Sequence, residues 1–219
     1  MNPSNVTLFY IHDPMCSWCW GFRPVWQQLE DQLRDTVNIV YVVGGLAADS
    51  DQPMPIGMQQ ALEATWQRIQ QQIPGTEFNY DFWRPASNTK PRRSTYPSCR
   101  AVLAAKIQDP KLEQAMILGI QRAYYLNAKN PSNIDALTDV ATSIGLKPEQ
   151  FRHDMASQTV EMQLQEQLQL ARRLSAQGFP SLVVSEGNNK GDRLHAIPLD
   201  YNNSHTMQQA IVTIARSAE

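Results

Sequence analysis

Short apolar runs begin the sequence and alternate with a helical pattern. Residues 6–11 are apolar and rich in β-branched side chains, which predicts a buried strand. Large apolar residues then recur at the spacing of one helical face, so we expect a helix over 18–33 with a kink at Pro24. Residues 37–43 form a second apolar run. Strand, helix and strand in this order predict a βαβ unit with a parallel strand pair.

The middle of the chain has the pattern of a helical block. Residues 58–73 are rich in glutamine and have one apolar face, which predicts an amphipathic helix. The segment 74–97 is irregular, and its aromatic residues argue against disorder. Prolines then separate further helical patterns at 98–108, 111–127, 134–144 and 148–157.

The last part of the chain combines helices with strands. A long helix is expected over 160–177, with Gly178 as its stop signal. Two short apolar runs joined by a polar turn predict a hairpin of strands at 181–185 and 193–197. A final helix is expected over 203–217.

Composition narrows the classes of function. The 219 residues carry a formal net charge of −2, so no basic field attracts nucleic acid or an anionic membrane, and neither is expected as a partner. The first apolar run is far shorter than the ~18–20 residues that span a bilayer, and no basic leader precedes it, so a cytoplasmic location is expected. Three cysteines cannot form a disulfide framework, and a close pair in a reducing compartment is expected to be reactive.

The segment Cys16-Ser17-Trp18-Cys19 stands at the junction of the first predicted strand and its helix. The first turn of a helix lowers the pKa of a thiol, so Cys16 is the candidate nucleophile. Cys19 follows one turn later on the same face, where it can resolve a mixed disulfide. A zinc site is one alternative, but the histidines and Cys99 lack ligand spacing, and no metal is predicted. A chance pair of buried thiols is the other alternative.

The segment Gly178-Phe179-Pro180 directly precedes the predicted strand at 181–185 and means little by itself. Together with the CxxC segment, however, the order of elements resembles the thioredoxin fold. The helical block after the second strand resembles the DsbA-like branch, which includes FrnE-type cytosolic oxidoreductases and kappa-class glutathione transferases. The run Asp-Pro-Met-Cys-Ser-Trp-Cys-Trp-Gly at 13–21 resembles the signature of predicted protein-disulfide isomerases of this branch.

The resemblance implies a fold and a domain division. It implies an α/β thioredoxin fold with a central mixed sheet and a large helical insertion after the second strand. Residues 1–56 and 158–219 would form the thioredoxin-like domain. Residues 57–157 would form the inserted helical subdomain.

The resemblance also implies roles for residues around the cysteine pair. Pro180 would follow a cis peptide bond and pack against the two thiols, and the backbone of Phe179 would pair with a substrate segment. Ser17 and Trp18 would tune the redox potential, and Trp18 offers an apolar surface to a client peptide. Asp13 is the candidate proton acceptor for the second cysteine, with a turn or capping role as its alternative.

Other residues near the predicted site have two interpretations each. A protonated His12 would stabilise the thiolate, whereas a histidine at a strand end is commonly structural. Cys99 is either a third redox thiol or a small buried hydrophobic residue. The basic run of Lys90, Arg92 and Arg93 is either a solvated loop or a site for the carboxylates of glutathione.

The sequence therefore predicts a thiol–disulfide oxidoreductase, similar to protein-disulfide isomerases, that acts on protein, peptide or small-molecule disulfides. Because the glutathione-using relatives hold a serine where this chain has Cys16, dithiol chemistry is favoured. A glutathione-dependent transferase or isomerase and a non-enzymatic redox sensor are the alternatives. No bound cofactor is expected, with glutathione as a co-substrate of the alternative reaction, and both a monomer and a homodimer stay open.

Overall fold

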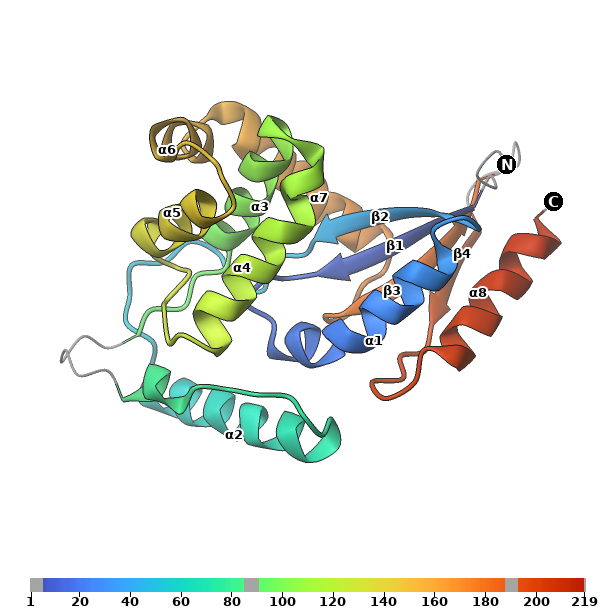
Figure 1. Cartoon of the computed structure of the whole chain (residues 1–219), viewed down its shortest axis with the longest axis horizontal. Helices are drawn as coiled ribbons and strands as arrows, with labels where there is room; N and C mark the ends of the chain where they lie inside the picture. The colour runs from blue at the N-terminus through green and yellow to red at the C-terminus, as the bar shows by residue number, and fades with distance from the viewer. Residues whose placement is uncertain (1–5, 85–90, 188–192, 219) are drawn as a thin grey trace.

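A mixed sheet of four strands lies at the centre of the computed structural model, which describes residues 6–84, 91–187 and 193–218 (Figure 1). The strand order is β2-β1-β3-β4. β1 and β2 are parallel, whereas β1 with β3 and β3 with β4 are antiparallel, so the predicted parallel pair and hairpin are confirmed. The strands are β1 Val6–His12, β2 Asn38–Val43, β3 Ser181–Glu186 and β4 Arg193–Ile197.

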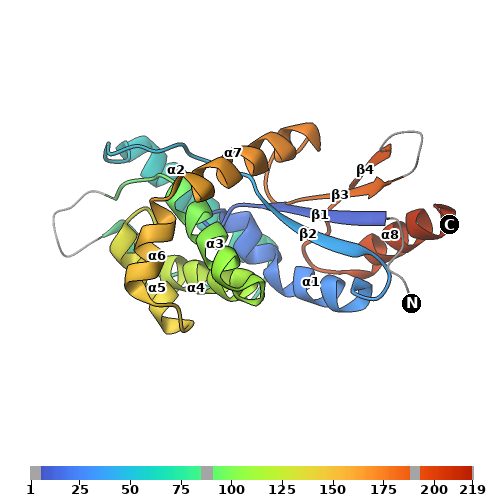
Figure 2. The ribbon, with the colours of Figure 1, turned by 90° about the horizontal axis from the view of Figure 1, so that it is seen from above.

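Helices cover both faces of this sheet. α1 (Ser17–Leu33) and α8 (His205–Ser217) lie on one face, and α7 (Gln158–Arg173) lies on the other, as Figure 2 shows from above. The apolar stripes of α1 and α8 pack with the inward side chains of β1 and β3 in one buried cluster. α1 continues through Pro24. None of the described helices is long and apolar enough to cross a membrane.

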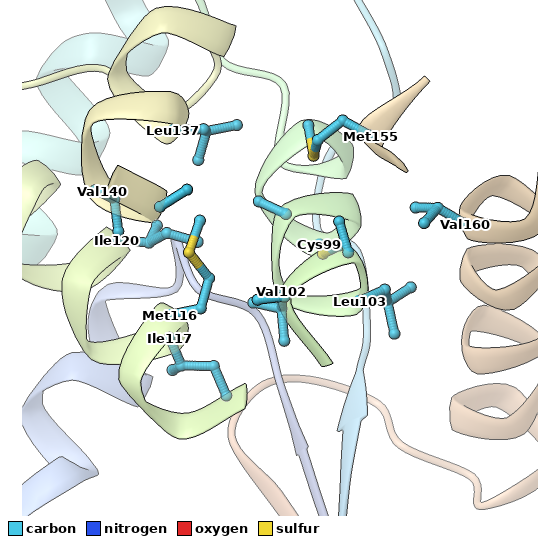
Figure 3. Packing of buried hydrophobic residues seen from close by; sticks show 14 of the residues in the cluster. Cys99, Val102, Leu103, Met116, Ile117, Ile120, Leu137, Val140, Met155 and Val160 are labelled. Carbon is cyan, nitrogen blue, oxygen red and sulfur yellow. The ribbon is translucent and has the colours of Figure 1, made fainter. Parts of the chain in front are cut away.

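Five further α-helices lie between β2 and α7 in the described part of the chain. Four of them, α3 to α6, pack with α7 around a second apolar core, part of which Figure 3 shows. Because α7 contributes side chains to this core and also covers the sheet, it joins the helical block to the strands. The division of the chain into a subdomain at 57–157 stays a prediction. The helices are α2 Ile56–Gln72, α3 Tyr96–Gln108, α4 Glu113–Tyr125, α5 Ile134–Ser143 and α6 Pro148–Met155.

Aromatic side chains hold the irregular segment after α2 in place. Trp66 of α2 is 1% exposed, and its ring stacks on Phe78 with centroids 4.8 Å apart. Phe82 and Trp83, in a short 3₁₀ turn at Tyr80–Trp83, pack on the same indole. The aromatic residues of this segment therefore form a third cluster with α2 and the end of α4.

The end of α7 differs from the sequence prediction. The helix ends at Arg173, several residues before the expected boundary, so the role of Gly178 as its stop signal is wrong. Ser175 adopts the left-handed conformation, with φ 57°, and the Ala176 N–H donates to the Ala171 carbonyl at 3.1 Å. This is a Schellman-type ending, and it places a serine where glycine is the common residue. Residues 174–177, which the prediction placed in the helix, instead belong to the connection that leads to Phe179.

Candidate functional site

Cys16 lies at the N-cap of α1, at the turn that follows β1. Its backbone is extended, with φ −82° and ψ 114°, and its Sγ accepts a hydrogen bond from the Cys19 N–H at 3.4 Å. The first turn of α1 contains no acidic residue. The Cys16 sulfur therefore lies beside the unpaired N–H groups and the positive end of the helix dipole.

The two thiols of the CxxC segment differ in exposure. Cys16 is 5% exposed and Cys19 is 0% exposed, and both are free thiols. Burial raises the pKa of Cys19 well above its ordinary value, and the neighbouring Cys16 raises it further. Both sulfurs are thus buried, Cys16 is the less buried of the two, and burial favours the protonated form of Cys19.

Phe179 contacts Cys16 through its backbone carbonyl. The Cys16 thiol donates to the Phe179 carbonyl at 3.2 Å, and the Phe179–Pro180 peptide bond is cis. The Phe179 ring packs directly on Gly44, where an added Cβ would overlap the ring. Gly44 directly follows β2, and its packing against a residue so distant in sequence gives no periodic signal. Gly44 therefore helps to fix the position of Phe179.

Asp13 is fully buried at the end of β1 and is surrounded by hydrogen-bond donors. Its carboxylate accepts from the Met15 N–H at 2.8 Å, the Leu46 N–H at 2.7 Å and the Thr95 hydroxyl at 2.6 Å. Burial raises the pKa of Asp13, although these three hydrogen bonds oppose the shift. The sequence did not indicate that Leu46 or Thr95 donates to Asp13, because each approaches from another element.

His12 differs from one of its two sequence interpretations. The side chain is 1% exposed, and burial lowers its pKa to about 3, with the charges of Lys106 and Arg23 acting in the same direction. The ring is therefore neutral at physiological pH, and the expectation that a protonated His12 stabilises the thiolate is wrong. It stacks on Tyr10 at 5.2 Å, so its role in the fold is packing.

The two residues between the cysteines differ in burial. Ser17 is 8% exposed and Trp18 is half-buried. The Trp18 ring meets the Tyr201 ring edge-on at 5.2 Å. The guanidinium of Arg68, from α2, lies over the Trp18 ring, with its central carbon 5.7 Å from the ring centroid.

Cys99 is a buried residue of the helical core. It lies on α3 among apolar side chains of α4 to α7, as Figure 3 shows. Its thiol also donates to the Asp13 carboxylate at 3.8 Å. Burial raises the pKa of Cys99 well above its ordinary value, which keeps the sulfur protonated and unreactive. This environment matches the interpretation as a small hydrophobic residue.

Comparison with known proteins identifies the family. A family model described as thioredoxin matches residues 9–206. The chain belongs to this thioredoxin family. Its α/β fold, with a mixed sheet and a helical insertion after the second strand, is therefore confirmed, and so is the resemblance to DsbA-like proteins.

Several solved structures of the thioredoxin fold are similar over nearly the whole chain. A candidate protein disulfide isomerase of Nitrosomonas europaea has a TM-score of 0.82 and 24% identity, covering 97% of this chain and 98% of that one. The cytosolic disulfide reductase DsbM of Pseudomonas aeruginosa, solved with glutathione, has a TM-score of 0.73 and 25% identity, covering 96% and 99%. The fold is thus that of DsbA-like thiol–disulfide oxidoreductases.

Two curated relatives have a different description. The ClpXP adapter protein SpxH of Halalkalibacterium halodurans is 24% identical over 187 residues, and that of Bacillus subtilis is 22% identical over 199 residues. These matches cover 84% and 90% of this chain. The chain spans 60% and 64% of the lengths of these relatives.

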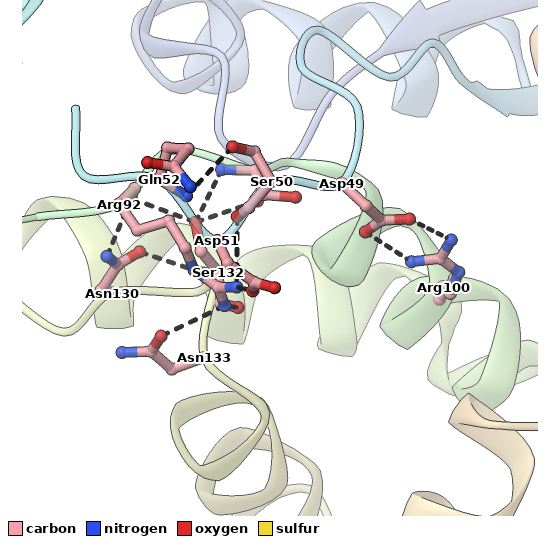
Figure 4. A network of polar contacts seen from close by, with 10 residues as sticks. Asp49, Ser50, Asp51, Gln52, Arg92, Arg100, Asn130, Ser132 and Asn133 are labelled. Atoms are coloured by element: carbon pink, nitrogen blue, oxygen red, sulfur yellow. Dashed lines mark hydrogen bonds and ion pairs between the residues drawn. The ribbon is translucent and has the colours of Figure 1, made fainter. Parts of the chain in front are cut away.

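The basic run of this thioredoxin-family chain is only partly a solvated loop. Lys90 lies outside the described residues. The Arg92 guanidinium pairs with Asp51 at 2.8 Å and donates to the Ser132 carbonyl, so it joins the segment between β2 and α2 to the loop before α5 (Figure 4). The interpretation as a solvated loop is therefore wrong for Arg92, whose donors are already engaged. Arg93 has no carboxylate within ion-pair distance in the part of the chain that the structure describes.

A metal centre has no candidate among the described residues. Within 6–84, 91–187 and 193–218, no group of three or more histidine, cysteine, aspartate or glutamate side chains is arranged to hold an ion.

Proposed function

We propose that this chain is a thiol–disulfide oxidoreductase in which Cys16 is the nucleophile and Cys19 is the resolving thiol. One observation carries the proposal. Cys16 caps α1, its sulfur accepts a hydrogen bond from the Cys19 N–H, and it keeps 5% exposure, whereas Cys19 is 0% exposed. A helix N-terminus stabilises the thiolate of an attacking cysteine, and a protonated second cysteine is held for the next step.

The reaction proceeds in two thiol–disulfide exchange steps. The Cys16 thiolate attacks one sulfur of a substrate disulfide, forms a mixed disulfide and releases the other substrate sulfur as a thiolate. Cys19 then loses its proton and attacks the Cys16 sulfur, which releases the second substrate thiolate and leaves a Cys16–Cys19 disulfide. The substrate gains two electrons and the enzyme loses two. Two equivalents of a thiol such as glutathione return the enzyme to the dithiol.

Residues around the pair would assist these steps. Asp13 is the acceptor for the Cys19 proton, because burial holds its pKa above the ordinary value of a carboxyl. The backbone of Phe179, whose carbonyl already contacts Cys16, would pair with the substrate segment. Trp18 and Ser17 would face the same segment. Pro180 would fix the backbone on the other side of Phe179.

The test compares turnover with covalent capture. The protein reduced by glutathione should cleave insulin disulfides, and Cys16→Ser should abolish this activity. Cys19→Ser should accumulate a mixed disulfide with the client, because the second step is blocked. The double variant Cys19→Ser/Cys99→Ser serves as the control and should still capture the client, which assigns the mixed disulfide to Cys16. Turnover that survives Cys16→Ser would exclude the mechanism, and glutathione conjugation surviving that change would indicate the transferase alternative instead.

Glutathione and a reducing compartment fit this proposal. The DsbM structure, at 25% identity, is described as a cytosolic disulfide reductase with glutathione, and glutathione is the dominant thiol of the cytoplasm. We therefore place the protein in the cytoplasm, with glutathione as its reductant and disulfide-bonded proteins or peptides as its clients.

A binding role is the second candidate, because both curated relatives are described as ClpXP adapter proteins. An adapter delivers a partner without consuming a disulfide. If this role holds, a Cys16→Ser/Cys19→Ser double variant should bind its partner as tightly as the unchanged protein. A redox sensor would instead be oxidised by peroxide and turn over no client.

A further inference from the structure

The Arg68 side chain lies over Trp18, in the segment between the two cysteines. Its guanidinium lies 5.7 Å from the centroid of the Trp18 ring, and Trp18 is one of the two residues between Cys16 and Cys19. Trp18 in turn contacts Tyr201 edge-on at 5.2 Å. Burial raises the pKa of Tyr201, and the charges of Cys19 and Cys16 raise it further, which indicates that this phenol also lies near the sulfurs. Arg68, Trp18 and Tyr201 therefore form one group beside the reacting atom.

The helix that carries Arg68 is fixed against the active-site elements. The Asn202 side chain donates to the Gln72 carbonyl at 3.4 Å, and Gln72 lies one turn after Arg68 on the same face of α2. The Trp20 indole, from α1, donates to the Glu77 carbonyl at 3.0 Å, just beyond that helix. α2 is thus attached both to α1 and to the loop of Tyr201, and Arg68 is directed toward the start of α1.

The charge of Arg68 is not neutralised by its neighbours. Glu63 is the other charged residue of α2, and it pairs with Arg84 at 2.8 Å. Among the described residues, no carboxylate lies within ion-pair distance of the Arg68 guanidinium. The first turn of α1, which contains Trp18, has no acidic residue either. The positive end of the helix dipole lies at this turn. Two sources of positive charge, the Arg68 guanidinium and the N-terminus of α1, therefore lie near Trp18.

We propose that Arg68, held over Trp18, forms a subsite for a carboxylate of the substrate beside the disulfide that Cys16 attacks. The inference deepens the proposed function and rests on it. The substrate class is a small acidic disulfide, in which carboxylates lie within a few bonds of the sulfurs, and glutathione disulfide is the probe. The apolar ring of Trp18 covers the backbone of such a substrate, while the guanidinium pairs with its charge.

The first test uses alkylation of Cys16, which requires no turnover. Iodoacetate and iodoacetamide each form a carbon–sulfur bond with the thiolate and release iodide, but only iodoacetate carries a negative charge. The ratio of the iodoacetate rate to the iodoacetamide rate at Cys16, measured by mass spectrometry, should fall about fivefold in Arg68→Ala, the upper range for one exposed charge pair. Arg68→Lys should retain most of the ratio. Arg34→Ala, at the far end of α1 and paired with Asp31, is the matched control and should retain all of it.

The second test uses substrates. Dithiothreitol is the reductant in this test, because glutathione would give no net reaction with its own disulfide. The ratio of kcat/KM for glutathione disulfide to kcat/KM for the neutral bis(2-hydroxyethyl) disulfide should fall by a similar factor in Arg68→Ala, mainly through KM. Ratios equal to those of the unchanged protein, in alkylation and in turnover, would overturn the subsite even if the protein is an active enzyme. Conversely, an alkylation ratio that depends on Arg68 without turnover of any disulfide would refute the proposed function and leave the anion subsite in place.

Discussion

The Thr95 hydroxyl donates a 2.6 Å hydrogen bond to the Asp13 carboxylate, although the two residues are 82 positions apart in the sequence. Thr95 directly precedes α3 in the helical block, and Asp13 lies in the turn before Cys16. The same carboxylate accepts from the Leu46 N–H, just after β2. One buried carboxylate thus joins the helical block, the sheet and the cysteine turn.

Loss of the Thr95 donor should destabilise the protein at neutral pH. Thr95→Val keeps the shape of the side chain but leaves a buried charge with one donor fewer, which should lower the free energy of unfolding by about 1.5–3 kcal/mol. The hydrogen bond favours the charged form of Asp13, so the deficit should shrink as the pH falls and the carboxyl becomes protonated. Urea denaturation of both proteins at several pH values measures this loss in the free energy of unfolding. Thr95→Ser, which keeps the donor, should restore most of the stability, and a deficit that does not change with pH would exclude this role of Asp13.

Removal of the Asp13 carboxylate should slow the second chemical step. In Asp13→Asn the Cys19 proton has no acceptor, so release of client from the mixed disulfide should slow by about a hundredfold, the scale of general-base catalysis. Formation of the mixed disulfide by Cys16 should change much less. Rapid-quench experiments that follow the two steps separately provide the measurement. Asp139→Asn, an exposed carboxylate on α5, is the control, and equal slowing of both steps would argue for a purely structural Asp13.

A side chain at Gly44 should displace Phe179 from Cys16. The Cβ of Gly44→Ala would overlap the Phe179 ring, so the ring and its backbone must shift, at a cost of about 1–3 kcal/mol for overpacking. The movement should also change the reactivity of Cys16, whose thiol donates to the Phe179 carbonyl. Thermal unfolding and the pH dependence of Cys16 alkylation measure the two effects. Gly57→Ala on α2 meets nothing within 4 Å and should be neutral or stabilising.

Buried His12 should make the fold sensitive to acid. Its pKa is about 3 in the folded protein against 6.5 as the ordinary value, so the unfolded chain binds the proton first as the pH falls. The free energy of unfolding should therefore decrease between about pH 6.5 and pH 3, by up to about 5 kcal/mol from this residue. His12→Phe, which cannot titrate, should reduce the slope of stability against pH in this window. An unchanged slope would show that other groups control the acid sensitivity.

Local chemistry made much of this fold predictable. The alternation of apolar runs and helical faces located the strands and most of the helices, because side-chain periodicity is set by the backbone geometry of each element. The largest difference between a predicted and an observed helix boundary is at the end of α7. It arose because Ser175 takes a left-handed conformation that glycine usually occupies. The CxxC segment was also evident, since its chemistry needs only a spacing of one helical turn.

The contacts that organise the site were decided by the tertiary structure alone. Thr95 reaches Asp13, the Phe179 ring covers Gly44 and Arg68 lies over Trp18, and in each pair the two residues belong to elements distant in sequence. No periodicity connects such residues, because their meeting depends on how helices and strands pack. The buried, neutral state of His12 has the same origin, since desolvation comes from the surrounding elements. The sequence by itself thus identified the pair of sulfurs proposed to react, and the packing of the chain decided which groups surround them.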